Sequence, residues 1–455
     1  MIARMRWLML LGFTVPALVV AQTTVRPDAD PRIEKLVAAV SEQRLRELAT
    51  KLVSFGTRNT LSDQTSATRG IGAARNWILE EMRRSSEKLR VNFDTHQIPP
   101  QGRITKPVDL RNVIAVLPGK SPRRIYVSGH YDSLNSGGQN RSNAAAPGAA
   151  PTSGGIDRSN VDVDAPGAND DGSGTVLTME LARVLAESGI QFDATLVFIC
   201  WAGEEQGLVG SRAHAMDLAA QKIPVEAVFN NDIVGNSRGG NGIVDAESVR
   251  VYAIGPEDSP ARSLARYIVK TAGTYVPSHR VRPMAREDRF GRGSDQSSFT
   301  AHGYPAIVFR EANENFDKQH GANDTLDGVD FTYLAQNARV NVAGVASLAL
   351  APPAPTVTNE RGGPRLSRDP SGYDATMRWT ASPGAAAYRV YWRDAWTNDW
   401  QHSQTVGNVT QFTLKNVSID DFVFGVAAIG ADGQESLISA FVSPVRRDEP
   451  LKKNQ

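Results

Sequence analysis

The sequence predicts an α/β domain with a mainly parallel twisted sheet and helices on both faces, followed by a small all-β sandwich. Up to residue 350, short runs rich in β-branched and aromatic residues alternate with longer segments of helical apolar spacing. At Ala351-Pro-Pro-Ala-Pro355 this alternation stops, and short alternating segments separated by turn residues follow. We therefore expect two folded domains joined by a stiff, Pro-rich linker at residues 351–355.

Residues 1–21 have the composition of a cleaved secretory signal peptide. Arg4 and Arg6 precede an apolar stretch from Trp7 to Val20, which closes on small residues at Ala21. A membrane anchor is the alternative, but this stretch is shorter than the roughly 20 apolar residues that span a bilayer. We expect an exported protein, extracellular or periplasmic, with no membrane span in the mature chain.

Composition excludes some classes of partner and of stabilisation. The 455 residues are 41% hydrophobic and 22% charged, as in ordinary globular proteins. Loss of the signal would remove two positive charges from a formal net charge of +1, so nothing favours nucleic acid as a partner. Cys200 is the only cysteine and lies in an apolar run, so no intrachain disulfide can form. A large core or bound metal must stabilise the exported chain.

The first domain is expected over residues 31–350. Apolar residues at helical spacing predict amphipathic helices, and β-branched or aromatic runs predict buried strands. The predicted helices are residues 31–54, 70–89, 175–188 and 259–272. The predicted strands are residues 110–117, 124–128, 194–201, 227–231, 250–254 and 306–309. Residues 135–166 are dense in Gly, Ser, Ala, Asn and Pro, which predicts a long mobile surface loop.

The second domain, residues 356–446, resembles a fibronectin type III domain. Its predicted strands are residues 376–379, 387–393, 410–414 and 422–428. The resemblance rests on Trp379, the YRVYW strand from Tyr388 to Trp392, Leu414, and residues 422–436. That family commonly has a tyrosine where this chain has Phe422. By this resemblance we consider a surface or matrix component as the partner of the domain.

Glu204 and Glu205 directly follow the predicted strand 194–201. The carboxyl edge of an open α/β sheet is where such proteins hold their ligands. Neighbouring side chains diverge there, so one carboxylate can hold a cation while the other acts on a water molecule. An isolated Glu-Glu pair is more often part of a solvated turn. Other motifs along the chain are what favour a functional role for this pair.

Further acidic and histidine side chains follow predicted strands or precede a predicted helix. They are His130 and Asp132 in GHYDS, Asp170 and Asp171 in NDDGSG, Asp232 in NNDIVG, and His320 in KQHGAND. Zinc accepts carboxylate and imidazole ligands, and a two-metal site needs a bridging carboxylate and two further ligands per ion. The remaining histidines lack acidic neighbours at a strand end, so we expect them to be structural.

In order, the motifs GHYDS, PGANDDGSGT, EEQGLVGS, NNDIVG, GSDQSSF and a late His followed by DT closely resemble the secreted di-zinc aminopeptidases. This leucyl aminopeptidase-like group is related to the glutamate carboxypeptidases, and the resemblance implies its phosphorylase/hydrolase-like fold. It also implies two Zn²⁺ ions bridged by Asp170. His130 and Asp232 would complete one metal position, and Glu205 and His320 the other.

The same resemblance implies the remaining catalytic roles. Glu204 would be the general base that moves a proton from the attacking water to the leaving amine, and Asp132 would orient His130. The bond between Asp170 and Asp171 would be a cis peptide. The expected substrates are the amino termini of peptides or proteins.

The predicted substrate pocket contains the main departure from the family. Many members have Ser-Asp-His where this chain has Ser294-Asp295-Gln296, so Asp295 and Gln296 are expected to contact substrate. Arg289 and Arg292 stand just before them and could clamp a substrate carboxylate, as a carboxypeptidase requires. Besides this carboxypeptidase, the alternatives are a mono-zinc cyclising enzyme of the same fold and a metal-stabilised binding module without catalysis.

Overall fold

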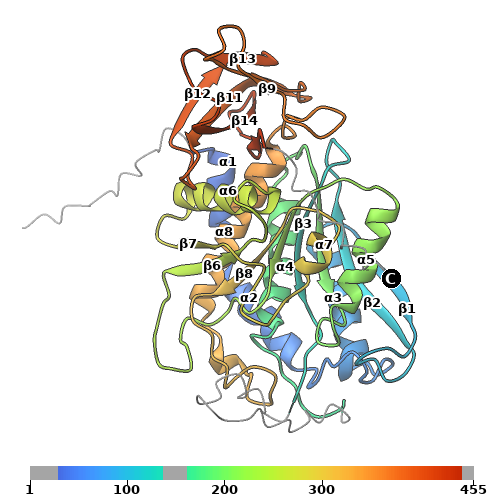
Figure 1. The fold of residues 1–455 in the computed structure, drawn as a ribbon. Coiled ribbons are helices and arrows are strands. Elements are labelled where there is room, and N and C mark those ends of the chain that lie inside the picture. The colour runs from blue at the N-terminus through green and yellow to red at the C-terminus, as the bar shows by residue number, and fades with distance from the viewer. Residues whose placement is uncertain (1–28, 137–160, 443–455) are drawn as a thin grey trace, which may run out of the picture.

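A twisted eight-stranded sheet forms the centre of the larger domain, with strand order β1-β2-β4-β3-β5-β8-β6-β7 (Figure 1). The computed structural model describes residues 29–136 and 161–442, so the predicted signal peptide and most of the predicted loop 135–166 lie outside the described residues. The strands are β1 (Arg90–Ile98), β2 (Val108–Leu117), β3 (Arg124–His130), β4 (Thr195–Trp201), β5 (Val225–Asn231), β6 (Ser248–Tyr252), β7 (Arg280–Met284) and β8 (Ala306–Glu311).

The centre of the sheet is parallel, as predicted, and its margins are mixed. β4, β3, β5 and β8 run parallel to one another, and β6 runs parallel to β7. The pairs β1–β2, β2–β4 and β6–β8 are antiparallel. β1 was not predicted because it is an edge strand in which exposed polar residues such as Asn92 and Thr95 interrupt the apolar pattern.

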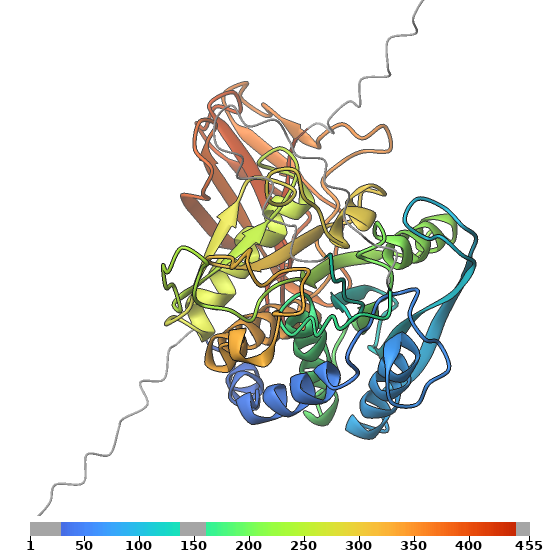
Figure 2. The same cartoon turned by 90° about the horizontal axis from the view of Figure 1, so that it is seen from below.

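Helices cover both faces of the sheet, unequally. They are α1 (Pro31–Ala38), α2 (Glu42–Val53), α3 (Gly70–Ser85), α4 (Gly172–Glu187), α5 (Val209–Ala220), α6 (Pro260–Tyr275), α7 (Gln296–Thr300) and α8 (Phe331–Leu350). Along β4, Phe198 belongs to the larger core under α2, α4 and α8, whereas Val197 and Trp201 belong to the smaller core under α5 and α7. Seen from below, the N-terminal helices and α8 lie along one side of the sheet (Figure 2). None of the helices in the described part of the chain has the length and apolar character needed to cross a membrane.

Two predicted helices have other bounds in the structure. The single helix predicted over residues 31–54 was wrong, because the chain forms α1 and α2 with a break before Ser41. The Ser41 hydroxyl accepts a hydrogen bond from the Arg44 backbone N–H (3.1 Å) and so caps the start of α2. The helix predicted over residues 70–89 ends at Ser85, since the chain turns there into β1.

The C-terminal region forms two small antiparallel sheets around its own core, as predicted for an all-β sandwich. One sheet has the order β13-β10-β9 and the other β12-β11-β14-β15. The strands are β9 (Leu366–Ser367), β10 (Ala375–Arg378), β11 (Ala385–Asp394), β12 (His402–Val406), β13 (Gln411–Leu414), β14 (Phe422–Gly430) and β15 (Ser439–Ala440). Trp379, Tyr388 and Phe424 are buried between the sheets. The fibronectin type III assignment stays a prediction.

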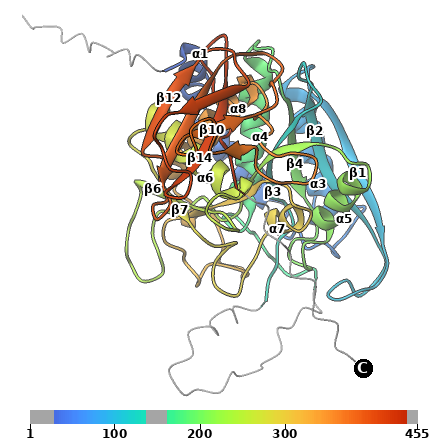
Figure 3. The ribbon, with the colours of Figure 1, turned by 45° about the horizontal axis from the view of Figure 1, so that its top comes forward.

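The end of α8 and the start of the linker to the small domain lie at the amino-terminal ends of the central strands. Arg123, just before β3, donates a hydrogen bond to the carbonyl of Ala351 (2.7 Å), and the Ala194 N–H before β4 donates to the carbonyl of Ala349 (3.0 Å). The sandwich lies next to α1 and α6 (Figures 1 and 3). The carboxyl edge of the sheet, which ends at residues such as His130, is therefore remote from this domain.

Specific side chains fix the two domains together. Arg393 of β11 makes two contacts with the carboxylate of Asp258 (2.7 and 2.9 Å), and its side chain is only 3% exposed. Ser263 of α6 donates a hydrogen bond to the carbonyl of Ile438 (3.0 Å), and Leu437 belongs to the larger core. The linker therefore joins domains that share a packed interface.

We predict that Arg393→Met destabilises the full chain by about 3 kcal/mol, because it leaves the Asp258 carboxylate without its partner in a largely buried interface. Denaturant unfolding measures this loss, and limited proteolysis near residues 351–355 should become faster. The control is Arg368→Met, which breaks an exposed ion pair with Asp420 within the same domain and should change little. Equal effects of the two substitutions would contradict a fixed interface.

Candidate metal centre

The five predicted metal ligands meet at the carboxyl edge of the parallel strands. His130 is the last residue of β3, and Asp232 follows β5, the neighbouring strand. Glu205 follows β4 on the other side of β3. Asp170 precedes α4, and His320 lies in the loop between β8 and α8. Topology therefore gathers residues that are up to 190 positions apart in the chain (130 to 320) at one place.

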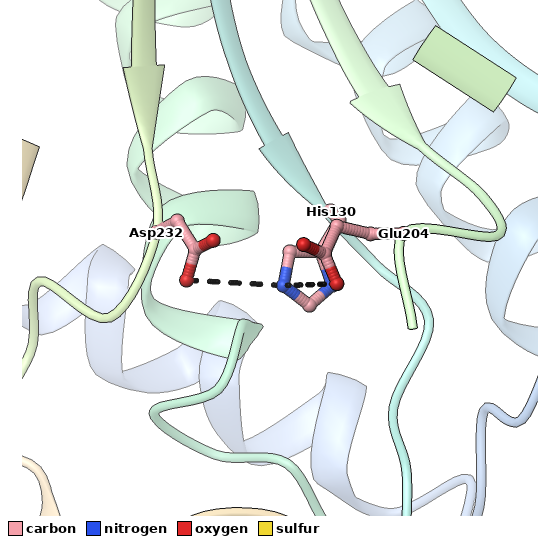
Figure 4. A group of neighbouring side chains, drawn as sticks. All are labelled: His130, Glu204 and Asp232. Atoms are coloured by element: carbon pink, nitrogen blue, oxygen red, sulfur yellow. Dashed lines mark ion pairs between the residues drawn. The ribbon is translucent and has the colours of Figure 1, made fainter. Parts of the chain in front are cut away.

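The candidate ligands form two groups. The first contains His130, Glu204 and Asp232, and Nε2 of His130 lies 4.0 Å from the Glu204 carboxylate and 3.9 Å from that of Asp232 (Figure 4). The second contains Asp170, Glu205 and His320.

Asp170 stands between the groups and faces both. Its Oδ1 lies 3.5 Å from His130 Nε2, and its Oδ2 lies 3.0 Å from His320 Nε2. Glu205 Oε1 lies 3.3 Å from the same His320 nitrogen. One carboxylate thus presents an oxygen to each group, which is the arrangement that a bridging ligand between two cations requires.

The donor set fits divalent cations. Asp170 Oδ2 and Glu205 Oε1 are buried and make no hydrogen bond of proper geometry within the described residues. Burial opposes protonation of His320, but the carboxylates of Glu205 and Asp170 prevail and raise its pKa to about 10. Burial likewise opposes protonation of His130, and Glu204, Asp132 and Asp170 hold its pKa well above the usual range. The site therefore concentrates negative charge that bound cations would balance.

Asp171 joins the elements that carry these ligands. Its carboxylate accepts hydrogen bonds from the backbone N–H groups of His130 (3.0 Å), Gly174 (2.9 Å) and Ile233 (3.1 Å). The peptide bond from Asp170 to Asp171 is cis, as the family resemblance implied. Gly174 allows this approach, because a Cβ there would lie 2.2 Å from the carbonyl oxygen of Asn231.

Comparison with known proteins gives the family. Residues 112–345 match the sequence model of peptidase family M28. The chain belongs to this family. A "Probable zinc metalloprotease" of Leptosphaeria maculans is 37% identical over 90% of this chain and 97% of its own length. A "Probable zinc metalloprotease" of Pyricularia oryzae is 39% identical over 90% of this chain and 84% of its own length. The M28 chain is accordingly a zinc metallopeptidase.

Solved structures show the M28 fold but not the reaction. The LapA aminopeptidase of Legionella pneumophila has a TM-score of 0.52 and 22% identity, covering 70% of this chain and 74% of its own. A glutaminyl cyclase of Porphyromonas gingivalis also has a TM-score of 0.52, with 17% identity over 68% of this chain and 98% of its own. An aminopeptidase and a cyclase share this architecture, so the fold does not identify the reaction. The side chains of the site are needed to distinguish between the two.

Asp132 of the M28 peptidase holds both the histidine and the glutamate pair. His130 Nδ1 lies closer to the backbone oxygen of Asp132 (3.1 Å) than to its carboxylate (3.6 Å). The carboxylate instead accepts hydrogen bonds from the backbone N–H groups of Glu204 and Glu205 (3.2 Å each). The expected orientation of His130 thus comes mainly from the backbone, while the side chain fixes the turn that carries both glutamates.

Two buried residues that support the M28 centre were missed. Asp324 accepts hydrogen bonds from the backbone N–H groups of Asn169 (3.0 Å) and Asp170 (2.9 Å), and so positions Asp170. The sequence did contain an indication of it, because Asp324 is the aspartate of the Asp-Thr pair that follows His320 in the family motif. Arg310, at the end of β8, contacts Asp232 and is completely buried. No local pattern marks it, because an arginine at a strand end is normally exposed.

The residues of the M28 peptidase that were predicted to line the substrate pocket differ in their hydrogen-bond and ion-pair partners. Burial raises the pKa of Asp295 to about 7, and Gln296 donates a hydrogen bond to the carbonyl of Glu287 (3.1 Å). Arg289 pairs within the chain, with Asp288 (3.2 Å) and Glu314 (2.6 Å).

Arg292 is the more accessible of the two arginines. It donates a hydrogen bond to Gln319 (2.7 Å), its side chain is 25% exposed, and it lies within electrostatic range of Asp170. Of the two, it is the arginine that has access to the site.

We predict that Asp132→Asn lowers kcat for peptide hydrolysis by about 10- to 100-fold, because an amide cannot accept both backbone N–H groups of the glutamate turn. Steady-state kinetics on zinc-loaded protein measure the effect, with zinc content determined in parallel. Thr60→Ala is the control, since it removes only the hydroxyl that donates to the Asp132 carboxylate (3.1 Å). A kcat unchanged by Asp132→Asn would leave the residue without a role in catalysis.

Proposed function

We propose that this M28 peptidase is an aminopeptidase that hydrolyses the amino-terminal bond of peptides or proteins with two zinc ions bridged by Asp170. His130 and Asp232 hold one ion, and Glu205 and His320 hold the other. Export of the protein, and a surface or matrix partner for the C-terminal domain, are parts of the same proposal.

The observation that carries the catalytic proposal is the position of Glu204. The Asp170, Glu205 and His320 group is complete without it. Glu204 belongs to the other group, with Oε2 4.0 Å from His130 Nε2, and its side chain is more exposed (14%) than those of Asp170 and Asp232 (4% each). A purely structural metal site would have no use for this additional carboxylate, whereas hydrolysis needs a base with access to the water.

The side chains support a proton transfer by Glu204. Bound zinc would supply Lewis acidity that lowers the pKa of water and stabilises the developing oxyanion. Burial raises the pKa of Glu204 well above its usual range, and the neighbouring Glu205 and Asp232 carboxylates add to this effect. A carboxylate with a raised pKa is a stronger base, so it can take a proton from water and donate it to the departing amine.

The charges around the site favour an amino terminus over a carboxyl terminus. Asp295 adds a buried carboxyl near His130, and the Arg289 guanidinium is already paired with Asp288 and Glu314. A carboxypeptidase would have to rely on Arg292 alone. Glu204 and Asp295 are carboxyl groups that our proposal does not assign to zinc, and a free ammonium group would complement them. Its recognition would restrict cleavage to the first residue.

We predict that the zinc-loaded enzyme releases free amino acids from unblocked peptides and none from the same peptides with an acetylated amino terminus. Mass spectrometry of matched peptide pairs measures this. Peptides that begin with glutamine belong in the set, because loss of ammonia without a cut would identify a cyclase. Release of the carboxy-terminal residue from the acetylated set would identify a carboxypeptidase and refute our proposal.

We also predict that Glu204→Gln keeps the wild-type zinc content and lowers kcat by about 1,000-fold or more, because the amide cannot carry the proton. Metal analysis and single-turnover kinetics on one preparation measure both quantities. Glu360→Gln, at an exposed position in the small domain, is the control for the same chemical change. Unchanged turnover with Glu204→Gln would remove this residue from the mechanism.

A further inference from the structure

A completely buried arginine lies against one of the proposed metal ligands. Arg310 Nη1 donates a hydrogen bond to the backbone oxygen of Asp232 (2.9 Å) and also pairs with its carboxylate Oδ1. The opposite side of the guanidinium contacts Asp288, through Nε to Oδ1 (3.3 Å) and Nη2 to Oδ2 (2.7 Å). Asp288 thus orients the guanidinium so that Nη1 points at Asp232.

The guanidinium and a bound cation would use the same carboxylate oxygen. Asp232 Oδ1, which pairs with Arg310, is also the oxygen nearest to His130 Nε2 (3.9 Å). The other oxygen, Oδ2, accepts a short hydrogen bond from the Ser294 hydroxyl. A cation held by His130 and Asp232 must therefore share Oδ1 with Arg310 or displace the Ser294 contact.

The second metal position has no such countercharge. In the part of the chain that the structure describes, no lysine or arginine forms an ion pair with the carboxylates of Asp170 or Glu205. Their ion-pair partners there are His130 and His320, which are themselves proposed ligands. Arg292 and the buried Arg58 act on Asp170 only at longer range, so the two positions differ in that one proposed ligand, Asp232, has a guanidinium in direct contact.

We propose that Arg310 is a positioning residue that acts as an internal countercharge for Asp232. It holds the carboxylate in place when no metal is bound, and it weakens zinc binding at the His130/Asp232 position. A buried carboxylate without a partner is unfavourable, so the metal-free chain gains stability from the guanidinium. A cation bound nearby loses part of the attraction of Asp232 and is repelled by Arg310. This inference rests on the proposed two-zinc function.

Zinc binding to the full-length protein tests this inference, with a chelator of known affinity as competitor. We expect Arg310→Met to bind the weaker of the two zinc ions at least about tenfold more tightly than the wild type, because a buried unit charge is removed from its surroundings. We also expect a larger rise in unfolding temperature on zinc addition, because metal-free protein loses more stability than zinc-loaded protein. Arg310→Lys, which keeps a cation, should restore most of the wild-type behaviour.

Two further variants separate this role from general destabilisation. Arg393→Met removes a buried arginine that pairs with Asp258 at the domain interface, and it should leave zinc affinity unchanged. If Arg310→Met does not fold, the double variant Arg310→Met/Asp288→Asn removes the second buried charge as well and gives the same test. Zinc affinity that is unchanged or weaker after loss of Arg310 overturns the inference.

Asp232→Asn distinguishes failure of the inference from failure of the metal centre. This variant should bind one zinc ion instead of two, as measured by metal content after dialysis. If it retains both ions with wild-type affinity, Asp232 is not a ligand and the proposed centre itself is refuted. If it loses one ion while Arg310→Met changes nothing, only the role of Arg310 is refuted.

Discussion

The carboxylate of Asp171 is the contact on which the metal centre depends. It accepts backbone hydrogen bonds from the end of β3, the start of α4 and the residue after Asp232. Ile233 has a left-handed backbone (φ 59°), which a β-branched residue rarely adopts and which the Asp171 contact helps to maintain. Three elements thus meet at one buried side chain, and the neighbouring Asp170 is placed between the two groups of ligands.

Around this contact, buried carboxylates of the M28 peptidase support Asp170 and the turn that carries Glu205. Asp132 fixes the turn of Glu204 and Glu205, and Asp324 fixes the backbone of Asp170. Such partners reduce the motion of a ligand before a metal arrives, so less order must be gained on binding. The carboxylates of Asp132 and Asp324 thus support the centre by accepting hydrogen bonds from backbone N–H groups. These contacts do not use the side-chain oxygens of Asp170 and Glu205, which would bind a cation.

The small domain contributes at the opposite end of the sheet. Its contact with α6 through Ile438, and the contact of the first linker residue, Ala351, with Arg123 before β3, lie at the amino-terminal ends of the parallel strands. The carboxyl edge that carries the candidate ligands is therefore separate from this interface, in which Leu437 packs into the larger core. This separation allows the domain to stabilise the chain through contacts that do not involve the candidate ligands.

The sequence by itself determined six of the eight strands of the central sheet, their order along the chain and the proposed ligands, but not β1 and β7. Apolar runs such as residues 194–201 must be buried, and polar residues directly after parallel strands must lie at one edge of the sheet. The break before Ser41 and the edge strand β1 were missed, because local capping and exposed polar residues weaken the periodic signal.

Only the tertiary structure decided which buried charges meet. The pairing of Arg310 with Asp232, the use of the Asp132 carboxylate for the glutamate turn, and the contact of Arg393 with Asp258 join residues that are distant in the chain. Their partners are set by how strands and helices pack, and hydrophobic periodicity carries no information about which polar side chains are then buried together.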